Sequence, residues 1–172
     1  MDPVSERLRA RHPQRIDLSL ERMRVLCAAL GDPQHKLPPV IHVAGTNGKG
    51  STVALIRAIA EAAGLKVHAY TSPHLVRFEE RCRVRGDAVD ASELIAACAR
   101  VEGARGEIAL TYFEFTTLAI LDVLARAGLD AVVLEVGLGG RLDAVNIIDT
   151  DCAIITSVDI DHAELLGDTR EQ

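Results

Sequence analysis

Residues Val43 to Thr52 read V-A-G-T-N-G-K-G-S-T and place a lysine and a serine among three glycines. The apolar run 40–43 precedes them, and a helical pattern over 53–64 follows. In such a strand–turn–helix unit, the N–H groups of the turn and the helix N-terminus face an anion. Lys49 adds a positive charge, and Ser51 offers an oxygen to Mg²⁺. The segment therefore predicts a nucleoside triphosphate site.

This segment departs from the usual phosphate-loop pattern G-x-x-x-x-G-K-[ST]. Val43 stands at the first glycine of that pattern, and Gly50 follows Lys49 directly. A plain glycine-rich turn between a strand and a helix is the alternative, but the flanking elements favour phosphate binding. We expect the nucleotide to contact Gly45, Thr46, Asn47, Gly48, Lys49, Gly50, Ser51 and Thr52.

A second group of polar residues surrounds a carboxylate at the end of an apolar run. Glu135 lies near the end of the run 131–136 and precedes a glycine-rich turn that contains Arg141. Ligands of open α/β sheets bind beyond the carboxyl ends of the strands, so Glu135 is suited to hold Mg²⁺ against phosphates. The alternative is a carboxylate that caps a loop. Arg141 either binds phosphate or is a solvated turn residue.

Three further segments hold residues that are suited to chemistry. His162 follows the run 153–156 and is a second metal ligand, a phosphate donor or a structural histidine. The Ser72-Pro73-His74 segment lines an active site or forms an ordinary turn. Three of the five aromatic residues lie at 112, 113 and 115. With Glu114 they suggest a wall for a planar substrate, although Phe115 also suits a helix core.

Composition limits the classes of protein to which the chain can belong. The 172 residues are 48% hydrophobic and 26% charged, as in an ordinary globular domain. The net charge of −6 argues against nucleic-acid binding. The four cysteines form no C-x-x-C pair, so we expect buried reduced thiols. No signal peptide opens the chain and its apolar runs are too short to span a bilayer, which predicts a cytoplasmic protein with no membrane contact.

Alternating apolar runs and helical patterns predict an α/β fold. Expected helices cover Leu18–Leu30 with Asp17 as the cap, Val53–Ala63, Ser92–Glu102 and Phe113–Ala127, and expected strands cover Val40–Ala44, Lys66–Tyr70, Arg81–Arg85, Ala131–Val136 and Ala153–Thr156. Thr71–Glu80 reads as a loop. Continuous apolar runs are typical of strands buried on both faces of a parallel sheet. We therefore predict a P-loop-type, mostly parallel sheet that is flanked by helices.

Five motifs occur in an order that resembles one family. They are A-G-T-N-G-K-G-S-T, T-S-P-H-L-V-R-F-E-E-R, Y-F-E-F, E-V-G-L-G-G-R-L-D-A-V-N and D-H-A-E-L-L-G. Together they resemble folylpolyglutamate synthase and dihydrofolate synthase, within the Mur ligase superfamily. The resemblance extends from about Ile16 to Gln172, which is nearly the whole chain.

The resemblance implies an ATP- and Mg²⁺-dependent ligase. A carboxylate of dihydropteroate or a reduced folate attacks the γ-phosphate, and the amino group of L-glutamate then displaces phosphate from the acyl phosphate. Which of the two acceptors is used, or whether both are, stays open. The family's enzymes usually act as monomers, so a monomer is expected. A cell-wall Mur ligase, which shares G-T-N-G-K, is an alternative, and a non-catalytic nucleotide-binding fragment is another.

The resemblance also implies roles for single residues. Lys49, Glu135 and His162 are expected to be catalytic, and Ser51, Ser72, Glu135 and His162 resemble the Mg²⁺ ligands. The residues that resemble substrate contacts are Leu18, Ser19, Leu20, Glu21, Pro73, His74, Thr111, Tyr112, Phe113, Glu114, Arg141, Leu142 and Asn146. Ser19 replaces a common glycine and Val145 a usual threonine, and these departures affect local contacts only.

The chain ends at Gln172 inside a polar segment that looks like the start of a helix. Residues 1–172 are therefore expected to be an incomplete ATP-binding domain. Family members carry a carbamylated lysine just beyond the D-H-A-E-L-L-G motif and then a C-terminal domain. Without both, the chain by itself is expected to bind nucleotide weakly and to turn over little.

Overall fold

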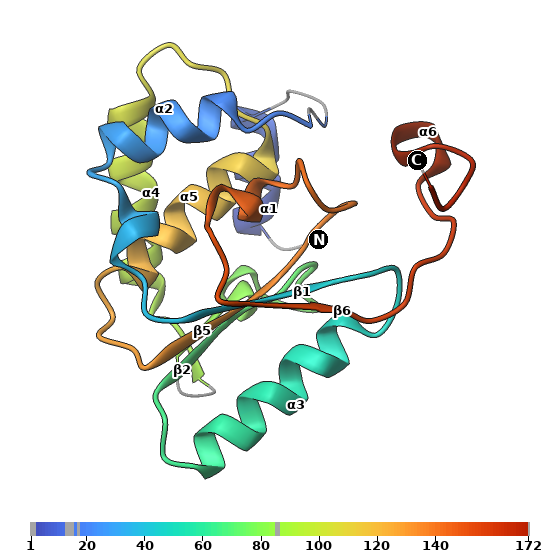
Figure 1. The fold of residues 1–172 in the computed structure, drawn as a ribbon. Helices are drawn as coiled ribbons and strands as arrows, with labels where there is room; N and C mark the ends of the chain where they lie inside the picture. The colour runs from blue at the N-terminus through green and yellow to red at the C-terminus, as the bar shows by residue number, and fades with distance from the viewer. Residues whose placement is uncertain (1–2, 13–15, 17, 85–86, 172) are drawn as a thin grey trace.

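One sheet with helices on both of its faces forms the fold (Figure 1). The computed structural model describes residues 3–12, 16, 18–84 and 87–171. In space, the strands follow the order β4-β3-β2-β5-β1-β6. Their bounds are β1 Val40–Ala44, β2 Val67–Tyr70, β3 Cys82–Val84, β4 Asp87–Ala88, β5 Ala131–Glu135 and β6 Cys152–Ile155.

The strands β2, β5, β1 and β6 run parallel, and the short β3 and β4 add an antiparallel edge. Val43 of β1 pairs with Glu135 of β5 and with Ile154 of β6. The carboxyl ends of these three strands therefore meet at one edge of the sheet, where parallel α/β folds bind their ligands. The expectation of a mostly parallel sheet is confirmed.

The helices divide between the two faces of the sheet. Figure 1 shows α3 alone on one face, α1, α2, α4 and α5 on the other, and α6 to one side. Their bounds are α1 Pro3–Arg11, α2 Glu21–Ala29, α3 Lys49–Ala62, α4 Ala91–Arg105, α5 Tyr112–Leu124 and α6 Ala163–Leu166, and the 3₁₀ turns are η1 Pro33–Lys36, η2 Phe78–Arg81 and η3 Ala144–Ile147. No helix in this described part is long and apolar enough to cross a bilayer.

The α5 helix is the centre of the core. Every residue from Glu114 to Leu124 is buried, which explains its strongly apolar sequence. Apart from Glu114 in the first turn, the only charged residue of this stretch is Asp122, which is paired with Arg100 of α4 and, at 3.2 Å, with Arg126. A buried carboxylate is tolerated in a core only when it is paired in this way. The pair also ties α4 to α5.

Several expected elements differ at their ends. The α2 helix begins at Glu21 rather than Leu18, and the expected cap Asp17 lies outside the described residues. Arg81 ends the η2 turn instead of starting a strand. The α1 helix and the two-residue β4 were not expected, because short polar segments carry little periodicity.

Two expectations about burial were wrong. Cys152 is exposed rather than buried, and β6 is exposed along most of its length instead of being covered on both faces. Among the described strands, β6 pairs with β1 alone and lies at the end of the sheet. An apolar run shows that a strand can be buried, but its place in the sheet decides whether it is.

His68 gives the fold a measurable pH dependence. Its ring is fully buried in β2, with Nε2 3.1 Å from the Cys82 Sγ, and burial lowers its pKa from 6.5 to about 3. The unfolded chain takes up a proton below pH 6.5 that the folded chain excludes. The free energy of unfolding should therefore be highest above pH 6.5 and fall towards pH 3, by up to about 1.4 kcal/mol per pH unit.

Urea unfolding of the native protein between pH 7 and pH 4 checks this expectation. His68→Leu should flatten the slope, whereas His35→Leu, at an exposed position, should leave it unchanged. A residual slope is expected because burial also lowers the pKa of His12 and His42. An equal slope in the native protein and His68→Leu would contradict the prediction.

Candidate functional site

Residues 45–48, which we call the phosphate turn, join β1 to α3 as the sequence predicts. Gly48 caps the N-terminus of α3 with a left-handed φ of 84°, and Gly45 has a φ of 125°. A side chain at Gly45 would overlap the Thr156 Oγ1 and approach the Ser157 carbonyl oxygen at 2.8 Å. Glycine is therefore required at 45 for both backbone conformation and space.

The segment after β6 holds this turn in place. The Thr46 N–H donates to the Ser157 carbonyl at 2.6 Å, and the Thr156 hydroxyl donates to the Asn47 carbonyl at 2.7 Å. The Thr46 hydroxyl donates to the Asp159 carbonyl at 3.0 Å. Sequence reasoning missed Thr156 and Ser157, since only the pairing of β6 with β1 brings them to the turn.

Lys49 and Ser51 lie in the first turn of α3. The Lys49 ammonium group donates to the carbonyls of Gly45 at 2.7 Å and Thr46 at 3.2 Å. Its positive charge is thus held over the turn, while Ser51 is exposed beside it. This arrangement suits an anion that approaches the helix N-terminus.

Glu135 and Ser72, two predicted metal ligands, are adjacent. The Ser72 N–H donates to Glu135 Oε2 at 3.1 Å, and Glu135 Oε1 lies 4.0 Å from the point where a side chain on Gly50 would begin. Burial raises the pKa of Glu135, and the Ser72 N–H together with the charges of Lys49 and Arg81 opposes the rise. The carboxylate therefore lies between the phosphate turn and the Ser72 loop.

This donor set fits Mg²⁺. The described residues contain no group of three or more His, Cys, Asp or Glu side chains that could enclose a metal ion. Mg²⁺ does not need such a cage, because it commonly binds through one or two carboxylates, phosphate oxygens and water. One buried carboxylate beside Ser72 and the phosphate turn is suited to that mode.

A cavity of about 510 Å³ lies over the phosphate turn. Gly45, Thr46 and Lys49 form one wall. Residues 137–143, the glycine-rich turn that contains Arg141, form another. His162 also lines it, from an exposed position before α6, with its Nε2 3.9 Å from an Asp161 carboxylate oxygen. We call this the nucleotide cavity. It brings Lys49, Arg141 and His162 together, and the role of each stays a prediction.

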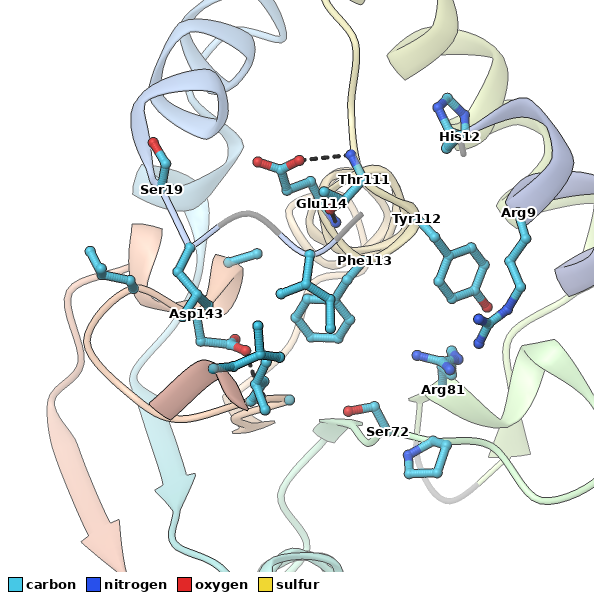
Figure 2. A pocket seen from close by; sticks show the side chains of 18 residues that line it. Arg9, His12, Ser19, Ser72, Arg81, Thr111, Tyr112, Phe113, Glu114 and Asp143 are labelled. Carbon is cyan, nitrogen blue, oxygen red and sulfur yellow. Dashed lines mark hydrogen bonds between the residues drawn. The ribbon is translucent and has the colours of Figure 1, made fainter. Parts of the chain in front are cut away.

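A second cavity of about 710 Å³ lies on the α5 side of the sheet (Figure 2). The predicted residues that line it are Leu18, Ser19, Ser72, Pro73, Thr111, Tyr112, Phe113, Glu114 and Leu142. We call it the acceptor cavity. Its walls combine the Phe113 and Tyr112 rings with few polar groups, which suits a planar aromatic molecule.

A capping box places the aromatic residues of this cavity. The Thr111 hydroxyl accepts from the Glu114 N–H at 3.1 Å, and Glu114 Oε2 accepts from the Thr111 N–H at 2.8 Å. Glu114 Oε1 also accepts from the Arg22 Nη2 at 2.9 Å. The start of α5 is thereby fixed to α2, and the rings at 112 and 113 are held between them.

The two cavities share the glycine-rich turn. Six residues line both: Leu18, Gly137, Leu138, Leu142, Asp143 and Leu165. Asp143 is buried and accepts from the Leu138 N–H at 2.8 Å and the Val145 N–H at 3.0 Å, and burial raises its pKa. A side chain on Gly137 would overlap the Phe113 ring. A ligand in either cavity therefore contacts the same turn.

Four predicted substrate contacts line neither of these two cavities. Leu20 is buried at the start of α2, and Glu21 is exposed and paired with Arg24 at 3.4 Å. His74 contacts the lining residue Arg81, from whose Nε its Nδ1 accepts at 2.9 Å. Asn146 accepts from His42 Nδ1 at 2.9 Å and donates to the Gly140 carbonyl, so it holds the glycine-rich turn from behind.

Sequence reasoning also missed residues that the fold brings to the site. Arg9, Arg81 and Asp143 line the acceptor cavity, and Arg22 holds Glu114. Arg81 stands inside a recognised motif, but nothing in its spacing distinguished it from the neighbouring arginines. Arg9 comes from α1, a helix that the sequence did not predict.

Comparisons with known proteins show the family to which this chain belongs. Residues 43–172 match the family model of the Mur ligase middle domain. The dihydrofolate synthase/folylpolyglutamate synthase of Escherichia coli K12 is 52% identical over 160 residues, which are 93% of this chain and 38% of that protein. The chain thus spans about two fifths of the length of this relative.

Solved structures give the same result. The structure of Escherichia coli FolC in complex with DHPP and ADP has a TM-score of 0.93 at 50% identity, and covers 98% of this chain and 40% of that one. A bifunctional folylpolyglutamate synthase/dihydrofolate synthase with Mn, AMPPNP and L-glutamate bound has a TM-score of 0.89 at 46% identity. This match covers 99% of this chain and 42% of that one. Because the matching family model includes the phosphate turn, Glu135 and the shared glycine-rich turn, this chain belongs to the Mur ligase family, in its middle domain, and is similar there to dihydrofolate synthase/folylpolyglutamate synthase.

Proposed function

We propose that this chain is the ATP-binding part of a ligase that joins L-glutamate to the carboxylate of a pterin-bearing acceptor, either dihydropteroate or a reduced folate. One observation carries the proposal: the nucleotide cavity and an aromatic acceptor cavity meet at one turn, with Glu135 and Ser72 beside the phosphate turn. The relatives, whose structures contain ADP, AMPPNP, DHPP or L-glutamate, support the choice of ligands.

In this proposal, the acceptor carboxylate attacks the γ-phosphorus of ATP. The bond from that phosphorus to the β-phosphate oxygen breaks, ADP leaves, and an acyl phosphate remains. The amino group of glutamate then attacks the acyl carbon, loses a proton and displaces inorganic phosphate. Such reactions depend mainly on position and on charge stabilisation.

The residues on the two cavities suit these tasks. Lys49 and the N–H groups of the turn would hold the phosphates, and the acceptor cavity would direct its carboxylate towards them. Glu135, Ser51 and Ser72 would hold Mg²⁺, with His162 as a further candidate ligand. When bound, Mg²⁺ would neutralise phosphate charge. Residues 1–172 are proposed to supply these two sites, and a further domain to complete the glutamate site.

The test is a ligation assay with the native protein, ATP, Mg²⁺ and L-glutamate. With dihydropteroate or tetrahydrofolate, mass spectrometry should show a product one glutamate residue heavier, with one ADP released per product. Omission of any component should abolish it. Ligation to a nucleotide-sugar peptide instead would place the protein with the cell-wall Mur ligases. Nucleotide binding without turnover of any acceptor would support a non-catalytic module.

A further inference from the structure

The acceptor cavity contains a buried positive charge without an acidic partner. The Arg81 side chain belongs to a residue that is only 4% exposed, and it lines this cavity. No carboxylate in the described part of the chain lies within ion-pair distance of it, in contrast to Arg22 and Arg100, which are paired with Glu114 and Asp122. An unpaired buried charge is strongly unfavourable unless something on or near the site compensates it.

The groups around Arg81 orient its side chain but do not neutralise its charge. The Arg81 Nε donates to His74 Nδ1 at 2.9 Å, so that ring nitrogen is the acceptor and carries no proton. His74 Nε2 lies 3.4 Å from the Ser5 hydroxyl of α1. This contact orients the imidazole, and the imidazole orients the guanidinium group. The planar guanidinium is thus held in one direction before any ligand binds.

A second cation lies at the same end of the cavity. The Arg9 guanidinium carbon is 4.6 Å from the centre of the Tyr112 ring, and that of Arg81 is 5.5 Å from the same centre. Figure 2 shows both side chains ending near the Tyr112 ring, with Ser72 next to Arg81. Arg9 also has no acidic partner among the residues that the structure describes. Two like charges at one end of a largely apolar cavity favour an anion there.

The two carboxylates of this cavity are already engaged by other groups. Glu114 is bound by Arg22 and by the Thr111 N–H, and Asp143 is bound by the N–H groups of Leu138 and Val145. Neither can turn to Arg81 without losing those bonds. The charge of Arg81 also acts on Glu135, but these two groups lie beyond ion-pair distance of each other. An anion that pairs directly with Arg81 in this cavity would therefore come from a ligand.

The position of Arg81 in the cavity indicates which part of the ligand carries the anion. Ser72 lines the cavity beside Arg81, and its N–H group is bound to Glu135, which adjoins the phosphate turn. The Arg81 end is thus the end nearest the transferring phosphate. We propose that Arg81, assisted by Arg9, binds the acceptor carboxylate that is to be phosphorylated and holds it against the repulsion of the triphosphate.

This inference rests on the proposed function and names a positioning residue for it. Binding of a carboxylate by a guanidinium group is often bidentate, and it needs both the charge and the planar geometry. Arg81→Lys should therefore restore only part of what Arg81→Gln loses. Binding of ADP in the absence of Mg²⁺ should be unaffected by either change, because Arg81 lines the acceptor cavity and not the nucleotide cavity.

The experiment compares pteroate with its carboxamide analogue, which lacks only the negative charge. By calorimetry, the native protein should bind pteroate more tightly than the carboxamide, by roughly 10- to 100-fold. Arg81→Gln should remove that preference while the Kd for ADP changes less than about twofold. Arg57→Gln, on α3 across the sheet, is the matched control and should keep the preference.

The possible outcomes distinguish a failure of this inference from a failure of the proposed function. If the native protein binds the carboxamide as tightly as pteroate, the inference is overturned whatever the variants do. If Arg81→Gln folds and keeps the preference, it is overturned as well. If Arg81→Gln does not fold, Arg81→Lys and Arg9→Gln decide the matter, since each should reduce the preference. Failure of the native protein to bind any pterin or to ligate glutamate would instead contradict the proposed function.

Discussion

Replacement of Lys49 by alanine in the native protein should lower the rate of ATP-dependent glutamate ligation by about a thousandfold or more. The Lys49 ammonium group is held 2.7 Å from the Gly45 carbonyl, directly over the phosphate turn. Charge builds up on the transferring phosphoryl group in the transition state. A cation held in place stabilises that charge without reorganisation, and alanine removes it.

Steady-state rates with saturating acceptor and glutamate measure this loss. Lys66→Ala is the control: Lys66 is exposed directly before β2, at the opposite edge of the sheet from the turn, and its removal should leave the rate unchanged. Urea unfolding of both variants establishes that they fold. Ligation by Lys49→Ala at the native rate would contradict the assignment of the turn.

Replacement of Glu135 by glutamine should remove the dependence of nucleotide affinity on Mg²⁺. The substitution keeps the size of the side chain and deletes the charge that lies between Ser72 and the phosphate turn. In the native protein, Mg²⁺ should tighten ATP binding by roughly 10- to 100-fold, because a charged ligand holds the ion against the phosphates. In Glu135→Gln, the affinities with and without Mg²⁺ should be nearly equal.

Isothermal titration with ATP, with Mg²⁺ or with a chelator, gives the four affinities that are needed. Glu107→Gln, at an exposed position, should behave like the native protein. If Mg²⁺ tightens binding equally in the native protein and in Glu135→Gln, Glu135 is not a metal ligand. The main role of Glu135 would then be to accept the hydrogen bond from the Ser72 N–H.

Local interactions explain how much of this fold could be predicted. The strand–turn–helix at 40–62 is marked by neighbouring residues: an apolar run, glycines where φ is positive, and a helical pattern. The cap of α5 is equally local, because Thr111 and Glu114 satisfy each other's N–H groups within one turn. Such features are visible in a sequence because the residues that mark them are close together along the chain.

Other features depended on which strands pair. Only the parallel pairing of β1 with β5 and β6 places Glu135, Thr156 and Ser157 around the phosphate turn. The sequence showed that an acid lay at the end of a buried strand, but not which strand lay beside it. The exposure of Cys152 was mispredicted for the same reason, since the position of β6 in the sheet is set by pairing and not by hydropathy.

By itself, the sequence determined the class of fold, the phosphate turn and the family, because these reside in contiguous motifs whose backbone chemistry is local. The tertiary structure decided that two cavities share one turn, and that Arg81 of η2 and Arg9 of α1 meet at Tyr112. Charges on distant segments become a site only when folding brings them together and removes the water between them. No pattern among neighbouring residues predicts that these charges will meet.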